Sequence, residues 1–176
     1  SDISVFRPST GTWFIFRSSD STVQTAGWGK SGDVPFAVDF DGDRKADYGI
    51  YRPTDPSNAN HATWYVLETN FNFGFILSSS WGLATDKPVP ADYDGDGKAD
   101  IAVWRPSDGN WYIANSGPAG GMQTVHWGVS GDVPQPADYD GDNKADVAVF
   151  RPSADPSQNY WYILRSSDQT FLPVKW

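Results

Sequence analysis

Apolar residues recur along this chain in short runs, and clusters of Gly, Pro, Asp and Ser separate the runs. In one such stretch the pattern predicts four strands, at residues 89–93, 101–105, 110–114 and 123–127. Runs of about five residues that are rich in β-branched and aromatic side chains favour strands. No longer stretch places apolar residues at the spacing of an amphipathic helix. The chain is therefore predicted to contain almost no helix.

The same pattern repeats along the chain, and two dipeptides mark each copy. A Trp-Gly pair opens a segment of constant length, at Trp28, Trp81 and Trp127. An Arg-Pro pair closes that segment, at Arg52, Arg105 and Arg151. The segments that follow differ in length, and their inserts are rich in Ser, Asn, Asp and Pro, which is typical of loop tips. A constant segment that alternates with a variable one indicates that the constant part builds a site.

These repeats predict an all-β fold, a β-propeller-like array of four blade units of antiparallel strands in one repeat domain, residues 1–176. Four strands in about 46 residues is the size of a propeller blade. Asp2 aligns with the last residue of an acidic loop, so the first unit is expected to lack its first strand. The predicted units span approximately residues 1–27, 28–80, 81–126 and 127–176.

Three acidic loops share the pattern D-[FY]-D-G-D-x-K-A-D, at residues 39–47, 92–100 and 138–146. Carboxylates this close in sequence repel one another unless a cation lies among them. Ca²⁺ takes about six to eight oxygen ligands in flexible geometry, whereas Mg²⁺ keeps several waters. Zn²⁺ prefers His or Cys, which these loops lack. The sequence therefore predicts about three Ca²⁺ ions, one in each loop.

The predicted ligands are the carboxylates at loop positions 1, 3, 5 and 9 and the backbone carbonyl of the Lys at position 7. They are Asp39, Asp41, Asp43, Lys45, Asp47, Asp92, Asp94, Asp96, Lys98, Asp100, Asp138, Asp140, Asp142, Lys144 and Asp146. At position 6, Gly97 and Asn143 tolerate a left-handed backbone, whereas Arg44 there would cost about 1–2 kcal/mol. We therefore expect the first loop to bind Ca²⁺ most weakly.

The repeated unit resembles the FG-GAP/VCBS repeat family. The motif W-G-x-x-G-D-x-P-x-x-A-D-Y-D-G-D-x-K-A-D-x-A-V-x-R-P is complete at residues 127–152 and occurs with small departures from Trp28 and from Trp81. Trp-Gly stands where the family name places Phe-Gly. The resemblance covers essentially the whole chain and implies that the acidic nonapeptides are calcium loops.

The resemblance also implies a β-propeller in a secreted or cell-surface protein whose role is binding or adhesion. The heads of integrin α-chains are examples of such propellers. Four units are fewer than the roughly six to eight blades usual in such propellers. Three arrangements therefore stay open. The units close into a ring, they belong to a longer array, or the first unit takes a strand from a neighbouring chain.

Other function classes find little support in the composition. The net charge of −9 argues against nucleic acid as a partner, because proteins that bind nucleic acids carry basic patches. No run of about 18 apolar residues predicts a membrane span, and the absence of Cys excludes disulfides.

His61 and His126 are interpreted as surface or packing residues, so we predict no catalytic residue and no enzyme. A disulfide-free repeat protein fits a secreted or cell-surface bacterial protein whose partner is a protein or a glycan.

A second set of repeated residues has two interpretations. In the structural one, the recurring arginines pair with Asp33, Asp86 and Asp132 and lock one unit onto the next. In the alternative, arginines and tryptophans line a recurrent pocket in which the rings stack on a sugar. That pocket would contain Arg52, Arg105, Arg151, Trp64, Trp111 and Trp161. The planar guanidinium of Arg suits both, because it pairs with carboxylates and stacks on rings; we favour the structural interpretation.

Three functions follow from these observations. The first is a calcium-binding extracellular module with a structural, adhesion or ligand-binding role and no catalysis. The second is a self-assembling surface filament element, in which the open strand edge of the first unit accepts a strand from another chain. The third is a lectin-like, carbohydrate-binding domain or an accessory domain of a secreted hydrolase.

Overall fold

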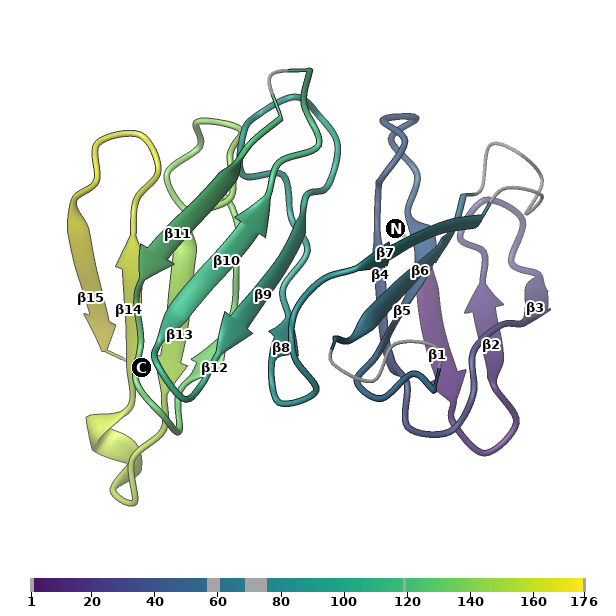
Figure 1. Ribbon diagram of the computed structural model, residues 1–176, viewed down its shortest axis with the longest axis horizontal. Helices are drawn as coiled ribbons and strands as arrows, with labels where there is room; N and C mark the ends of the chain where they lie inside the picture. Colours follow the sequence, from purple (N-terminus) through teal and green to yellow (C-terminus); the bar gives the residue numbers. More distant parts are fainter. Residues whose placement is uncertain (1, 57–60, 69–75, 119, 176) are drawn as a thin grey trace.

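The computed structural model describes residues 2–56, 61–68, 76–118 and 120–175 (Figure 1). Within these ranges the chain forms strands β1 to β15 in four antiparallel sheets, and its one helical segment is a short 3₁₀ turn, η1 (Pro156–Gln158). The predicted all-β fold is confirmed. The structure is consistent with propeller-like blades that follow one another along the chain.

Each sheet is built from strands that are consecutive in the sequence. The first sheet, in the order β1-β2-β3, contains β1 (Ile3–Arg7), β2 (Thr12–Phe16) and β3 (Val23–Gly27). The second, in the order β4-β5-β6-β7, contains β4 (Val34–Val38), β5 (Asp47–Arg52), β6 (Thr63–Leu67) and β7 (Ile76–Ser80). The third, in the order β11-β10-β9-β8, contains β8 (Lys87–Pro88), β9 (Ile101–Arg105), β10 (Asn110–Ala114) and β11 (Met122–His126). The fourth, in the order β12-β13-β14-β15, contains β12 (Val133–Pro134), β13 (Val147–Arg151), β14 (Tyr160–Leu164) and β15 (Phe171–Lys175).

The strand boundaries follow the sequence pattern with one exception. Strands β9 and β10 have the predicted bounds, and β11 begins one residue earlier than expected. The first strand of the third sheet was predicted at residues 89–93 and instead is the two-residue β8, followed by an isolated bridge between Ala91 and Asp100. Pro88 and Pro90 explain this difference, because proline has no N–H to donate to a sheet ladder.

The four sheets lie one behind the next along the long axis of the molecule, from β1–β3 at one end to β12–β15 at the other (Figure 1). Buried apolar clusters lie between consecutive sheets. Between the first two sheets, Trp13 and Ile15 pack with Tyr48 and Ile50. Burial of such large side chains is the main stabilising contribution in a fold without helices or disulfides.

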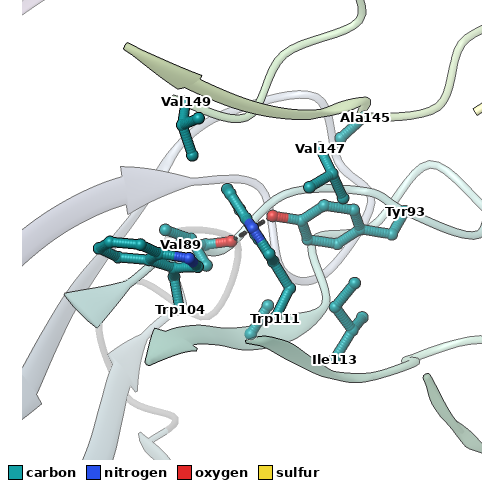
Figure 2. Packing of buried hydrophobic residues seen from close by; sticks show 9 residues of the cluster. Val89, Tyr93, Trp104, Trp111, Ile113, Ala145, Val147 and Val149 are labelled. Atoms are coloured by element: carbon teal, nitrogen blue, oxygen red, sulfur yellow. Dashed lines mark hydrogen bonds between the residues drawn. The ribbon is translucent and has the colours of Figure 1, made fainter. Parts of the chain in front are cut away.

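The cluster between the third and fourth sheets shows the same arrangement (Figure 2). Trp104 and Trp111 of the third sheet have no exposed surface, and Val149 of the fourth sheet lies against them. The Tyr93 hydroxyl donates a hydrogen bond of 2.7 Å to the Val89 carbonyl in this cluster. The polar end of this buried ring is therefore satisfied inside the core.

Two of the three Trp-Gly pairs connect neighbouring sheets by hydrogen bonds. The indole of the third-strand Trp64 donates to the Trp81 carbonyl at 3.0 Å, and the Trp81 indole in turn donates to the Tyr112 carbonyl of the next sheet at 3.2 Å. The Trp127 indole makes the same bond to the Tyr162 carbonyl at 3.0 Å. The Trp28 indole N–H is buried and has no hydrogen-bond partner within the described ranges, so the feature that all three tryptophans share is packing of the ring against an apolar cluster.

The repeated arginines make bidentate ion pairs with buried aspartates. Arg105 Nε and Nη2 each lie 2.9 Å from a carboxylate oxygen of Asp86, and its guanidinium lies 4.3 Å from the centre of the Tyr112 ring. Asp86 also accepts the backbone N–H of Leu83. The equivalent pairs are Arg52–Asp33 and Arg151–Asp132.

These ion pairs differ from the structural interpretation in one respect. Both partners of each pair belong to the same predicted unit, so the pair does not lock one unit onto the next. Asp86 lies in the turn after a Trp-Gly pair, and Arg105 ends the second strand of the following sheet, β9. The pair therefore fixes the turn against its own sheet.

We predict that Arg105→Ala lowers the free energy of unfolding by about 3 kcal/mol, because it leaves the fully buried Asp86 side chain without its cation. Arg17→Ala is the matched control, because its pair with Asp20 is about half exposed, and it should leave the unfolding midpoint nearly unchanged. Urea unfolding followed by tryptophan fluorescence measures both. Equal effects of the two substitutions would contradict a structural role for the Arg105 pair.

Candidate metal centres

Each acidic loop connects the first strand of a sheet to its second strand. In every loop the structure brings three carboxylate oxygens, one from each of three aspartates, to within 4.8 Å of one another. The three groups are Asp39, Asp41 and Asp43; Asp92, Asp94 and Asp96; and Asp138, Asp140 and Asp146. The predicted side-chain ligands at positions 1 and 3 therefore meet in all three loops.

The loops curl through two left-handed backbone positions. Gly95 at position 4 and Gly97 at position 6 have φ values of 83° and 86°. Their N–H groups donate to the two oxygens of Asp92 at 2.6 and 2.8 Å, so the position-1 carboxylate holds the curl together. In the first loop, Arg44 occupies position 6 with φ of 67°, which is the strained conformation expected from the sequence.

The carboxylates at positions 3 and 5 point into the same loop. Asp41 accepts the N–H of Asp43 at 2.9 Å, and Asp43 accepts the N–H of Lys45 at 2.8 Å. Each of these bonds uses one carboxylate oxygen, so the second oxygen of each residue remains for another partner. In Asp43 that second oxygen lies 3.0 Å from the Lys45 ammonium group.

The aspartate at position 9 has a different environment from the other three. Asp47, Asp100 and Asp146 have no exposed surface. Asp100 accepts the N–H of Tyr93 at 2.9 Å and the N–H of Ser116 at 2.6 Å, which ties the loop to the end of β10. Asp146 is the one position-9 residue that also belongs to a three-carboxylate group. Position 9 thus anchors every loop, and its role as a ligand stays a prediction.

One carboxylate oxygen in the first loop lacks a partner. Asp41 Oδ2 is buried and accepts no hydrogen bond within the described ranges. Burial raises the pKa of Asp41, the N–H of Asp43 opposes that shift, and the charges of Asp47, Asp43 and Asp39 add to it. A buried anionic oxygen without a donor is costly unless a cation is bound to it. The donor set, which is entirely oxygen, fits a hard divalent ion such as Ca²⁺.

The third loop differs because protein groups already surround its position-3 aspartate. Asp140 Oδ2 accepts from the Ser167 hydroxyl at 2.6 Å and lies 3.3 Å from Nε of Arg165. The Ser167 hydrogen bond is the main cause that lowers the pKa of Asp140. Sequence reasoning missed Arg165, whose one signal is its place directly after the last residue of a third strand, β14.

The residues proposed for a sugar pocket lie in the interior or in ion pairs. Trp64 and Trp111 have no exposed surface, and Trp161 is partly buried. The three arginines make the Asp pairs described above. In this structure two of the three rings therefore present no face on which a sugar could stack.

Comparison with known proteins adds one finding to this geometry. Residues 92–149, which begin at the second acidic loop and end within β13, match the FG-GAP-like repeat. The chain carries an FG-GAP-like repeat. The expected resemblance is confirmed, and the other acidic loops stand in the same register of their own sheets. No curated protein matches the chain.

FG-GAP-like repeats are typical of extracellular adhesion or ligand-binding modules and are generally not enzymes. None of the helical segments that the structure describes has the length and apolar character needed to cross a membrane. The repeat thus gives the class of module to which the chain is similar.

We predict that Asp41→Asn has opposite effects with and without Ca²⁺. In excess chelator the variant should melt a few degrees higher than the parent, because it removes one of several mutually repelling carboxylates and keeps an oxygen for the Asp43 N–H. In millimolar Ca²⁺ it should melt lower, because a ligand charge is lost. Differential scanning calorimetry in both buffers checks the crossing; a shift of the same sign in both would contradict a metal site at Asp41.

Proposed function

We propose that this chain is a calcium-binding extracellular repeat module in which the ions stabilise the scaffold and no catalysis occurs. One observation carries the proposal. Three loops with the same sequence pattern occupy the same place in three sheets, and each gathers carboxylate oxygens within 4.8 Å of one another. Asp41 Oδ2 is buried and accepts no hydrogen bond from the part of the chain that the structure describes, which favours a cation over an acidic surface turn without an ion.

The loops are placed where an ion would also stabilise the stacking of sheets. The Ala99 N–H of the second loop donates to the Asp39 carbonyl of the first loop at 2.7 Å, and the Ala145 N–H donates to the Asp92 carbonyl at the same distance. One backbone hydrogen bond therefore connects each of the first two acidic loops to the loop that follows it. An ion that rigidifies one loop also fixes the carbonyl that holds the next loop.

Calcium bound in these loops would hold the loops in place, as disulfides do in other extracellular proteins. This chain has no Cys with which to form a disulfide. Extracellular modules bind Ca²⁺ with dissociation constants near 10⁻⁴–10⁻³ M, and free calcium outside cells is roughly millimolar. Binding to the folded state alone then adds about 1–2 kcal/mol of stability per site with a dissociation constant near 0.1 mM. The residues that bind a protein or glycan partner would lie on the loops and edges of this stabilised scaffold.

We predict that Ca²⁺ raises the melting temperature of the chain markedly and that excess chelator lowers it again. Circular dichroism melts at increasing Ca²⁺ measure the effect, with Mg²⁺ at the same concentrations as the control, because Mg²⁺ loses its waters reluctantly. A melt that is the same in millimolar Ca²⁺ and in chelator would overturn the proposed function.

A second candidate function is self-association, which the exposure of the end sheets favours. In the first sheet, Ile3 and Val5 are 68% and 60% exposed, whereas Tyr48 and Ile50 at the same places in the second sheet are 9% and 2% exposed. Those counterparts are buried because the preceding sheet covers them. At the other end Tyr139 is 41% exposed, although its counterparts in the first two loops are buried.

The two end surfaces are the two halves of the interface that joins the sheets inside the chain. A second copy is therefore the partner that we propose for them, stacked head to tail. Strand β1 adds to this, because it is an edge strand with pairing groups free on one side.

We predict that the chain shows concentration-dependent association in sedimentation velocity and that Val5→Asp abolishes it. Met122→Asp is the control, because Met122 is 75% exposed but lies on β11 of the third sheet, which is not one of the two end sheets. A parent chain that stays monomeric at high concentration, or equal loss in both variants, would exclude this candidate.

A further inference from the structure

One edge of the first sheet is open where the other sheets have a further strand. Within the described ranges β1 pairs with β2 alone, so the backbone groups on its other side have no strand partner. In the second, third and fourth sheets that edge is covered by β4, β8 and β12, and an acidic loop follows each of these strands. The fourth sheet therefore shows which contacts a complete edge makes.

Arg7, at the end of β1, lacks the carboxylate that its counterparts hold. In the fourth sheet Arg151 makes two hydrogen bonds of 2.8 Å to Asp132, the residue directly before β12. Arg7 has the same position over a ring, since its guanidinium lies 4.5 Å from the centre of Phe14, as that of Arg151 does from Tyr162. Arg7 is exposed and makes no ion pair with a residue that the structure describes. The first sheet thus presents a placed guanidinium without its carboxylate.

The turn after β2 repeats the turn after β14 residue by residue. Both have the sequence Arg-Ser-Ser-Asp, at residues 17–20 and 165–168. In both, the Arg N–H donates to the carbonyl of the Thr five residues later, Thr22 at 2.9 Å and Thr170 at 3.0 Å. The residue that follows the motif has φ of 57° in both turns. The two turns therefore present the same side chains from the same backbone.

In the fourth sheet this turn holds the acidic loop. The Ser167 hydroxyl donates to Asp140 at 2.6 Å, and Nε of Arg165 lies 3.3 Å from the same carboxylate. The Ser166 hydroxyl donates to Asp142 at 2.9 Å. Positions 3 and 5 of the loop are therefore bound by the Arg-Ser-Ser part of the turn.

In the first sheet the position-9 aspartate is also in place. The Ser18 N–H donates to Asp2 at 2.8 Å, as the Ser166 N–H donates to Asp146 at 2.7 Å. The other oxygen of Asp146 accepts the N–H of Tyr139 from the acidic loop. The other oxygen of Asp2 accepts no hydrogen bond from a described residue. The turn and the position-9 carboxylate are thus arranged around a loop that is not among the described residues of this sheet.

We propose that the open edge of β1 is a docking site for another polypeptide that presents a G-D-x-P strand followed by an acidic D-x-D-G-D loop. The aspartate before the strand would pair with Arg7, and the strand would add to β1 in the antiparallel direction of β12 on β13. The acidic loop would lie against Arg17, Ser18 and Ser19. Charge favours this occupant, because an acidic segment meets a guanidinium at each end of the edge. The docking does not depend on the calcium function, and it uses the edge of β1 rather than the outer faces that stacked copies would bury.

The test uses the full chain and a synthetic peptide with the sequence of residues 128–145. This peptide contains Asp132, the residues of β12 and loop positions 1 to 8, and it stops before position 9 because Asp2 of the chain supplies that carboxylate. The fluorescence anisotropy of the labelled peptide measures its dissociation constant in millimolar Ca²⁺. A peptide of the same composition in scrambled order is the control for charge attraction alone.

We expect the peptide to bind saturably and Arg7→Ala to weaken the binding by about tenfold or more, because a desolvated charge pair loses one partner. The loss should not add to that of Asp132→Asn in the peptide, because the two changes break the same pair. Arg17→Ala should also weaken binding. Lys175→Ala is the matched control, because it removes an exposed cation from β15, in the sheet at the other end, and it should leave binding unchanged. Far-ultraviolet circular dichroism verifies that each variant retains the strand signal.

The outcomes separate this docking site from the calcium function. No saturable binding, or equal binding of the scrambled peptide, would overturn the docking site, and additive losses in the Arg7 and Asp132 variants would overturn the pairing. Association of copies of the chain that the peptide disrupts would overturn a separate partner and make a second copy the occupant. A chain that melts higher in Ca²⁺ but does not bind the peptide keeps the calcium function alone. A chain that binds the peptide but melts the same in Ca²⁺ and chelator keeps the docking site alone.

Discussion

The buried aspartate at position 9 is the contact on which each acidic loop depends. Asp100 has no exposed surface, and it accepts N–H groups from Tyr93 in its own loop and from Ser116 after the third strand. A carboxylate in this place closes the loop and aligns it with the sheet. Because it is an anion, it also adds to the negative potential that the neighbouring aspartates create. The residue that anchors the loop therefore also adds a negative charge beside the other loop aspartates.

The loop geometry and the stacking of sheets are coupled through the backbone. The first residue of one loop accepts a hydrogen bond from position 8 of the next, as in Ala99 to Asp39. The Trp-Gly pairs make a second connection, from Trp81 to the Tyr112 carbonyl of the following sheet. Apolar packing supplies most of the cohesion between the sheets, but packing alone is not directional. These hydrogen bonds fix how one sheet is placed on the next.

Much of this architecture could be predicted from sequence, because its signals are local and repeated. Alternation and turn residues located β9 and β10, and the missing first strand followed from the alignment of Asp2. The short β8 was mispredicted because Pro88 and Pro90 lie in an apolar run that otherwise favours a strand. The acidic loops could be located from their aspartate-rich sequence pattern. Residues that contact a loop from elsewhere in the chain, such as Arg165, could not, because strand pairing brings a residue after the third strand to the loop.

Repetition within the chain separates what the scaffold needs from what varies around it. Every complete unit keeps the Asp–Arg pair, the Trp-Gly pair and the loop aspartates. The Asp–Arg pair fixes a turn against its own sheet, the Trp ring packs between sheets, and the position-9 aspartate anchors the acidic loop. The residue after the third strand differs between units, since it is Glu68 in one and Arg165, whose Nε lies 3.3 Å from Asp140, in another. Contacts that recur in every complete unit therefore belong to the scaffold, and the residues that differ change the charge of a unit without changing its fold.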